Sequence, residues 1–232
     1  MFLRARWSPS FEALTAALCA LALCLVAPAG RAAPSRGAVG GQVTVMKGGD
    51  KKSDASGVVV YVTGPKDAAP KGTSVHKVRQ KDKQFDPSLT IVLKGETVEF
   101  PNEDKIHHNV FSVSKPARFD LGLYKAGTSK SVKMKKAGVV DVYCNIHPEM
   151  VAKILVLDTK YFAVTDKDGK FSIDGLPAGT WKIIAWHPHG KQWEGSVTVT
   201  GGGTASVDIT VEAGDSSTRH AKKDGTPYGR YK

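Results

Sequence analysis

Cysteine is scarce in this sequence, and long apolar runs are confined to its first 30 residues. Only three of the 232 residues are cysteines, and two of them, Cys19 and Cys24, lie in that apolar run. Cys144 is therefore alone in the rest of the chain, which excludes an intrachain disulfide there. Because no later apolar stretch is as long as a membrane-spanning helix, we expect no integral membrane span in the mature chain.

Motifs of the common catalytic and nucleotide-binding classes are also missing. There is no Gly-rich phosphate loop and no Ser-His-Asp order, so we predict that the protein is not an enzyme. Lysine and arginine number 33 against 22 aspartates and glutamates, a formal net charge of +11. This excess suits an acidic partner protein, although a solvated basic surface is the simpler interpretation. No nucleic-acid-binding module is recognisable, and we expect no nucleic-acid partner.

The first 33 residues are typical of a secretory signal peptide. Arg4 and Arg6 provide a positive start, residues 13–27 are mainly apolar, and small residues follow. This order matches the charged, apolar and cleavage regions of a signal. We therefore expect export to the periplasm, an oxidising compartment in which a lone thiol is a liability unless it is buried or bound.

Short apolar runs separated by glycine and proline turns fill most of the remaining chain. Apolar and polar residues alternate in these runs, and no sustained helical period follows the first 33 residues. The alternating sets include Leu89, Ile91 and Leu93; Phe119, Leu121 and Leu123; and Val140, Val142 and Cys144. The pattern predicts an all-β fold. Residues 213–232 are polar, basic and aperiodic, which predicts a disordered tail.

One segment concentrates metal-binding chemistry. Cys144, His147 and Met150 follow one another at intervals of three residues after a predicted strand, and His108 follows another strand upstream. A thiolate, two imidazoles and a weak axial thioether are the donors of a blue-copper site. Zinc would also accept a cysteine and two histidines, but methionine is a poor zinc ligand, so its position favours copper.

Three separated segments resemble the cupredoxin family, in the order in which that family has them. Residues 94–104 are similar to its strand pair with a glycine turn, residues 108–110 read His-Asn-Val as in plastocyanin and amicyanin, and residues 142–150 are similar to the ligand loop of amicyanin. The resemblance covers roughly residues 74–158. One departure is Ile146, which stands where plastocyanin and amicyanin commonly carry proline.

The cupredoxin resemblance implies a specific set of ligands. It implies one type 1 copper ion with equatorial ligands His108, Cys144 and His147 and axial ligand Met150. Asn109 would hold the ligand loops together from outside this set. The exposed edge of His147 would be the port for electrons.

The stretch after residue 160 resembles the carboxypeptidase regulatory-like (transthyretin-like) module, through residues 168–171 and 176–181. The opening strands of such a module are missing there, whereas residues 38–66 look like them. We therefore predict one discontinuous module of residues 38–66 and 160–212, with a Greek-key cupredoxin β-sandwich, residues 72–158, inserted. The alternative is a simple tandem in which residues 38–66 add strands to the cupredoxin.

Together these features predict an exported mononuclear type 1 copper protein that transfers electrons between redox partners. The chain also resembles exported methylamine-utilisation-type proteins, a label from which no reaction follows. The alternative function is a copper-binding or scaffold protein of the cell envelope without an electron-transfer role. His187 and His189 lack cysteine or carboxylate company, so a structural role is favoured for them over metal binding.

Overall fold

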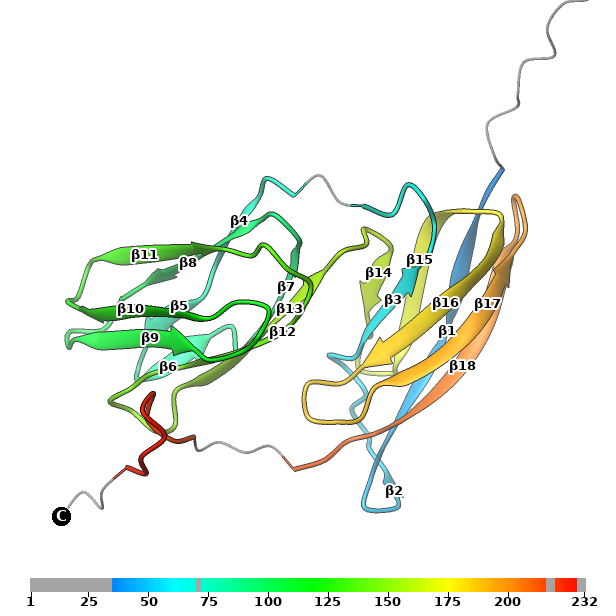
Figure 1. The fold of residues 1–232 in the computed structure, drawn as a ribbon. Coiled ribbons are helices and arrows are strands. Elements are labelled where there is room, and N and C mark those ends of the chain that lie inside the picture. The colour runs from blue at the N-terminus through cyan, green and yellow to red at the C-terminus, as the bar shows by residue number, and fades with distance from the viewer. Residues whose placement is uncertain (1–34, 70–71, 216–219, 229–232) are drawn as a thin grey trace, which may run out of the picture. The chain divides into compact units, whose positions relative to one another are not determined.

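A computed structural model describes residues 35–69, 72–215 and 220–228 (Figure 1). These residues form 18 strands, and no helix occurs among them. Within the described ranges there is accordingly no helix long and apolar enough to cross a membrane. The all-β fold class is confirmed. The expected signal peptide, residues 1–33, lies outside the described residues.

The strands between residues 72 and 158 form two sheets and a hairpin. They are β4 (Val75–Lys77), β5 (Arg79–Lys81), β6 (Gln84–Asp86), β7 (Leu89–Leu93), β8 (Thr97–Pro101), β9 (His108–Ser112), β10 (Phe119–Tyr124), β11 (Ser129–Lys133), β12 (Gly138–Tyr143) and β13 (Val151–Leu157). One sheet has the order β10-β9-β12-β13-β7 and the other the order β11-β8-β4, while β5 pairs with β6. The two sheets enclose a common core.

That core follows from the alternation along the strands. Val98 and Phe100 of β8 are fully buried and pack in one cluster with Val140 and Val142 of β12. Cys144 continues the inward face of β12 by one further step and is also fully buried. The apolar face that the sequence predicts for this strand is therefore confirmed, and it leads directly into the predicted metal loop.

β10 departs from the predicted alternation. Leu123 was expected to share an inward face with Phe119 and Leu121, but its side chain is 58% exposed. The pairing of β10 with β9 shifts between Asp120 and Leu123, where Gly122 adopts a left-handed φ of 66°. Such a bulge reverses the faces beyond it, and Tyr124 becomes the buried residue. The prediction for Leu123 is wrong for this reason.

The other strands form a second pair of sheets. They are β1 (Arg36–Lys47), β2 (Asp50–Lys51), β3 (Val59–Thr63), β14 (Phe162–Val164), β15 (Lys170–Pro177), β16 (Gly179–Trp186), β17 (Trp193–Val199) and β18 (Thr204–Glu212). One sheet has the order β15-β1-β18, with β2 beside β1, and the other the order β14-β3-β16-β17. Figure 1 shows β1 running between β15 and β18.

These sheets join segments on either side of residues 72–158. Val43 of β1 lies opposite Ile209 of β18, and Val62 of β3 lies opposite Ile183 of β16. All four side chains belong to one buried cluster. On these pairings we propose that residues 38–66 and 160–212 form one module with residues 72–158 inserted. In the tandem alternative, β3 would instead pair with strands of the inserted region.

Residues 220–228, within the stretch expected to be a disordered tail (213–232), have a defined conformation. Residues 220–228 form a turn in which Lys222 donates its N–H to the Thr226 carbonyl oxygen over 2.9 Å. The segment also bonds to the region of residues 72–158, where the Tyr228 hydroxyl donates to the Cys144 carbonyl oxygen over 2.7 Å. Aperiodic polar composition favours disorder only where such fixed partners are lacking.

The proposed module predicts where a core substitution in its first segment should act. Val60→Ala removes two buried methyl groups from the cluster that contains Ile183 and should lower the free energy of unfolding by about 2 kcal/mol. Hydrogen exchange should then quicken at the amides of β16 and β18, and stay unchanged in β12 and β13. Val164→Ala, at a side chain 43% exposed, is the matched control. Loss of protection in β12 and β13 would favour the tandem.

Candidate metal centre

Adjacent strands bring the predicted ligands together. His108 is the first residue of β9, and Cys144 comes directly after β12. The two strands are antiparallel neighbours, with Tyr143 opposite Phe111, so the start of β9 lies beside the end of β12. His147 stands on the loop between β12 and β13. Pairing within one sheet therefore places donors from distant parts of the sequence at one end of the core.

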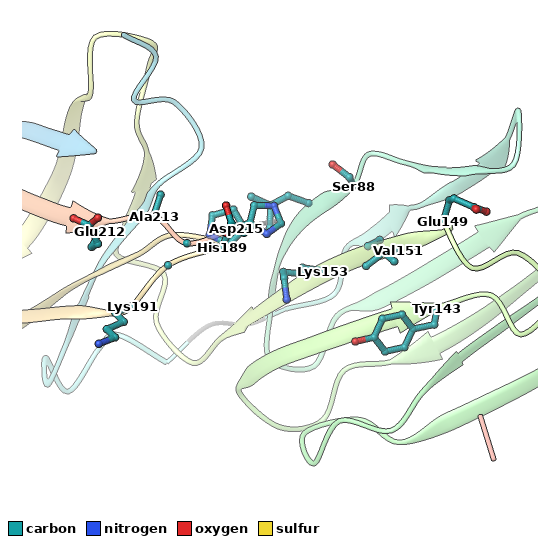
Figure 2. Close-up of a pocket in the computed structure, with 15 residues that line it drawn as sticks. Ser88, Tyr143, Glu149, Val151, Lys153, His189, Lys191, Glu212, Ala213 and Asp215 are labelled. Carbon is teal, nitrogen blue, oxygen red and sulfur yellow. The ribbon is translucent and has the colours of Figure 1, made fainter. Parts of the chain in front are cut away.

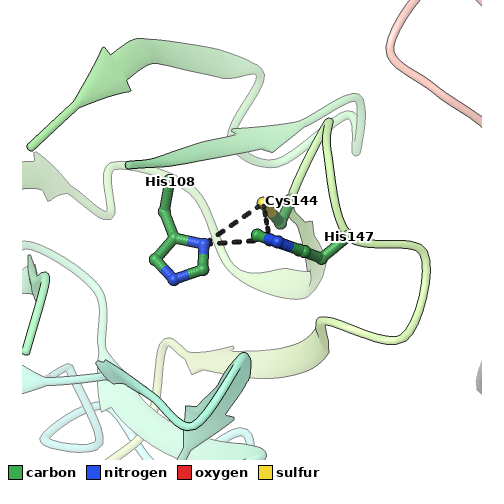
Figure 3. Close-up of side chains that lie close together, drawn as sticks. All are labelled: His108, Cys144 and His147. Carbon is green, nitrogen blue, oxygen red and sulfur yellow. Dashed lines mark hydrogen bonds between the residues drawn. The ribbon is translucent and has the colours of Figure 1, made fainter. Parts of the chain in front are cut away.

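The three donor atoms form a compact triangle (Figure 3). Cys144 Sγ lies 3.8 Å from His108 Nδ1 and 3.6 Å from His147 Nδ1, and the two nitrogens are 3.1 Å apart. Metal–nitrogen and metal–sulfur bonds in proteins are about 2.0 to 2.3 Å long, so one ion fits within a triangle of this size. Among the described residues, these three form a group able to hold a metal ion.

The far side of the His108 ring is held by a carboxylate. His108 Nε2 lies 2.7 Å from Asp104 Oδ2, and the histidine is fully buried. An N–H at Nε2 that donates to this carboxylate leaves the Nδ1 lone pair directed at Cys144 and His147. A carboxylate partner of this kind fixes the tautomer and ring orientation of a ligating histidine and raises its basicity.

Asp104 is itself held by the β5–β6 hairpin. The backbone N–H groups of Asp82 and Lys83 donate to its two carboxylate oxygens over 2.7 and 3.0 Å. Both turn residues have left-handed φ angles, 52° and 56°, which direct their N–H groups toward it. Burial alone would raise the pKa of Asp104, but hydrogen bonds from Lys83, His108 and Asp82 outweigh burial and hold this pKa below its usual value. The group therefore remains a carboxylate.

The Cys144 sulfur sits in an apolar environment that contains a few directed donors. Burial raises the pKa of the Cys144 thiol, while backbone N–H groups of Ile146, Asn109 and His147 act in the opposite direction by hydrogen bonding to the sulfur. Thiolate is the form that binds metal. The pocket thus disfavours a free thiolate and supplies donors suited to a metal-bound one. Ile146, which stands in place of the proline, contributes one of these N–H groups.

His147 is shifted toward its neutral form. Burial lowers its pKa, and the positive fields of His108 and Lys83 lower it further. A neutral imidazole is the form that can donate a lone pair to a metal ion. His147 is half-buried, whereas His108 is fully buried.

Met150 and Asn109, the other two predicted site residues, are both linked to Cys144. Met150 is fully buried in the same cluster as Cys144, and its carbonyl oxygen accepts the Cys144 N–H over 3.3 Å, closing the ligand loop. The Asn109 side chain donates to Asp120 Oδ1 over 2.7 Å. Asn109 Oδ1 is buried and has no hydrogen-bond partner within the described part of the chain.

His107, His187 and His189 lie outside the triangle. His107, the neighbour of His108, is exposed. His187 and His189 lie together, with ring centroids 6.1 Å apart, but they belong to no metal-binding group among the described residues. Sequence reasoning missed Asp104. A carboxylate four residues before His108 was the available signal, but its role depends on the hairpin that turns it toward the ring.

Comparison with known families matches both parts of the chain. A sequence model of copper binding proteins of the plastocyanin/azurin family matches residues 73–157. A model of the carboxypeptidase regulatory-like domain matches residues 150–212. The second match begins at the end of the ligand loop and does not include residues 38–66.

Individual relatives cover parts of the chain. The probable rhamnogalacturonate lyase A of Aspergillus flavus is 35% identical over 74 residues, which are 31% of this chain and only 14% of that protein. A purple cupredoxin from Nitrosopumilus maritimus is 20% identical, covering 35% of this chain and 99% of that one (TM-score 0.32). A variant of amicyanin in the Cu(I) form is 22% identical. The match covers 42% of this chain and 98% of that one, with a TM-score of 0.34.

A further solved structure with a similar fold is the copper-containing nitrite reductase from Thermus scotoductus. It is 23% identical, and the match covers 49% of this chain and 28% of that one, with a TM-score of 0.34. With identities of 20–23% and TM-scores of 0.32 to 0.34, these structural likenesses carry no argument about this chain.

The contact between Asp104 and His108 generates a prediction about metal affinity. Asp104→Asn keeps the shape of the side chain but removes the charge that polarises the imidazole. Affinity for Cu(II), measured by competition with a chelator, should fall by about tenfold. Glu103→Gln neutralises the exposed neighbouring carboxylate and should leave the affinity unchanged. Equal losses in the two variants would mean that general surface charge, not the contact with His108, is responsible.

Proposed function

Because the chain contains a copper-binding domain of the plastocyanin/azurin family and a carboxypeptidase regulatory-like domain, we propose that it is an exported type 1 copper protein that carries single electrons between redox proteins. The observation that carries this proposal is the triangle of His108 Nδ1, Cys144 Sγ and His147 Nδ1. These donors come from two neighbouring strands and one loop, and all belong to the chemistry that selects copper.

We assign the equatorial positions to His108, Cys144 and His147 and the axial position to Met150. A copper ion bound there would supply a one-electron Cu(II)/Cu(I) couple with strong thiolate character. The assignment of Met150 is supported by its full burial in the same cluster as Cys144 and by its position on the same short loop. Asn109 contributes through its backbone N–H to the Cys144 sulfur and through its side chain to Asp120.

Fixed donors favour electron transfer over storage. His108, Cys144 and Met150 are fully buried, and His108 is held from behind by Asp104. Side chains packed at this density in a core change position little. A site whose ligands cannot rearrange needs little reorganisation when its charge changes, which is the property that a carrier requires.

The half-buried His147 is the proposed port for electrons, because it is the more exposed of the two histidines in the triangle. The formal net charge of +11 favours an acidic redox partner;. Residues 1–33 support export to the periplasm, through their charged start and apolar centre. The proposal involves no catalytic step by this chain.

The alternative is a copper-binding or scaffold protein of the cell envelope without electron transfer. This alternative is supported by the regulatory-like module, which contributes none of the three donors of the triangle. Optical and EPR spectra of the copper-loaded protein, followed by a redox titration, separate the two functions. A carrier is coloured and cycles reversibly, whereas a Cu(I) storage protein is colourless and does not cycle.

The assignment of Cys144 predicts the loss of colour in one variant. Cys144→Ser should abolish the intense absorption of the copper-loaded protein, because a hydroxyl cannot replace the covalent thiolate bond. The measurement is the visible spectrum after loading with Cu(II). His107→Gln, next to His108, should keep the full band because His107 is exposed. A blue band retained by the serine variant would show that the thiolate is elsewhere.

The assignment of Met150 predicts a shift in potential instead. Met150→Gln should keep the colour but lower the reduction potential, since a harder axial ligand favours Cu(II) over Cu(I). Protein-film voltammetry gives the potential directly. Met46→Gln replaces a half-buried methionine of β1 and should have the wild-type potential. An unshifted potential for Met150→Gln would remove Met150 from the axial position.

A further inference from the structure

The segment 220–228 has a shape of its own. Lys222 donates its N–H to the Thr226 carbonyl oxygen, and Gly225 donates its N–H to the Lys222 carbonyl oxygen, each over 2.9 Å. Asp224 Oδ1 accepts from both the N–H and the hydroxyl of Thr226. Gly225 has a left-handed φ of 83°, which glycine adopts without strain;. These bonds make a compact turn rather than an extended tail.

This turn lies on the ligand loop. The Tyr228 hydroxyl donates to the carbonyl oxygen of Cys144 over 2.7 Å, and the Lys223 N–H donates to Asn145 Oδ1 over 2.8 Å. The His220 ring stacks on Tyr143, with centroids 4.4 Å apart and planes inclined by 27°. Tyr143 projects from β12 near Val151 of β13, the residue opposite it in the sheet (Figure 2). Three consecutive residues, 143–145, are therefore contacted.

A second route reaches Cys144 from the same segment. The Lys223 ammonium bonds to Asp120 Oδ2 over 2.7 Å, and Asp120 Oδ1 accepts from the Asn109 side chain. Asn109 in turn donates its backbone N–H to the Cys144 sulfur. The hydrogen bond from Lys223, opposed by burial and aided by bonds from Gly122 and Asn109, lowers the pKa of Asp120 to about 2. Tyr228 therefore contacts the Cys144 carbonyl oxygen directly, and Lys223 is linked to the Cys144 sulfur through Asp120 and Asn109.

We propose that residues 220–228 form a clasp in which Tyr228 and Lys223 are positioning residues for the ligand loop 144–150. The clasp holds the loop in its metal-binding shape before the ion arrives. This inference rests on the proposed function in that the loop carries the copper ligands. Ordering a loop in advance removes that cost from the binding step, so the clasp should strengthen copper binding.

The first test uses the full-length metal-free protein and hydrogen exchange measured by NMR. The informative amides are those of Cys144 and Met150, which close the ligand loop by bonding to the carbonyl oxygens of Met150 and His147. Tyr228→Phe removes only the hydroxyl, and Lys223→Met removes the ammonium. Each variant should speed exchange at these two amides about fivefold, the effect of one hydrogen bond of ordinary strength.

Controls separate a local clasp from general stability. Lys136→Met removes an exposed lysine between β11 and β12, outside the clasp. This variant should leave exchange in the ligand loop unchanged. The amides of Val142 and Ile154, within the same sheet, should also be unaffected in all three variants. Faster exchange throughout that sheet would overturn the clasp, because it would mean global destabilisation.

The second test uses the copper-loaded protein. Transfer of Cu(II) to a chelator should be about fivefold faster from Tyr228→Phe and from Lys223→Met, for the same reason. Wild-type rates of loop exchange in both variants would overturn the clasp, even with a normal blue site in the wild-type protein. Faster loop exchange in a protein that never turns blue would support the clasp and contradict the proposed electron carrier. The two proposals therefore fail on different observations.

Discussion

The Cys144 sulfur is buried in an apolar cluster, and a thiolate there is unfavourable unless its charge is compensated. Burial raises the thiol pKa, and only three backbone N–H groups oppose this effect. The two histidine nitrogens that share its pocket carry no compensating charge when neutral, and the lowered pKa of His147 favours the neutral form. A bound metal cation resolves this conflict, because it supplies positive charge at the point where the thiolate and the imidazoles converge. The rest of the domain serves to bring these three side chains to that point.

Hydrogen bonds that hold the His108 ring continue through Asp104 to the β5–β6 hairpin. The Asp104 carboxylate is held by backbone N–H groups of the β5–β6 turn, and it holds the His108 ring in turn. A hairpin that is distant from the ligand loop in sequence thereby fixes one donor. Because each bond in this chain is directed, a small change in the hairpin would be transmitted to Nδ1. Rigidity of this kind would suit the proposed electron carrier, whose site would change charge without changing shape.

The strands outside residues 72–158 come from two separate stretches of the chain that pair with each other. Strands β1 and β3 lie before the copper-binding region, yet they pair with β18 and β16 after it. Under the proposed division, the regulatory-like module can close only when both of its segments are present. Residues 220–228 contact the loop beside Cys144. The copper-binding loop is thus contacted by residues that its own family match, residues 73–157, does not include.

Much of the fold could be predicted because alternation of apolar residues reports directly which face of a strand is buried. Val140, Val142 and Cys144 are all inward, as their spacing indicates. The alternation gave a wrong prediction for Leu123, because a bulge in β10 reverses the buried and exposed faces beyond it. The two-residue pattern of the sequence does not reveal such a bulge. Composition predicts a disordered tail for residues 213–232, but it carries no information about the partners that residues 220–228 contact on the ligand loop.

The sequence by itself determined the donor types and their order, since a cysteine, two histidines and a methionine at these intervals can be read without coordinates. Only the tertiary structure decided which groups stand behind the donors. Asp104 meets His108 because a hairpin turn directs it there, and Tyr228 meets Cys144 across 84 positions of the chain. Such contacts join positions whose separation along the chain follows no local period. They are set by the packing of whole strands, which no short segment encodes alone.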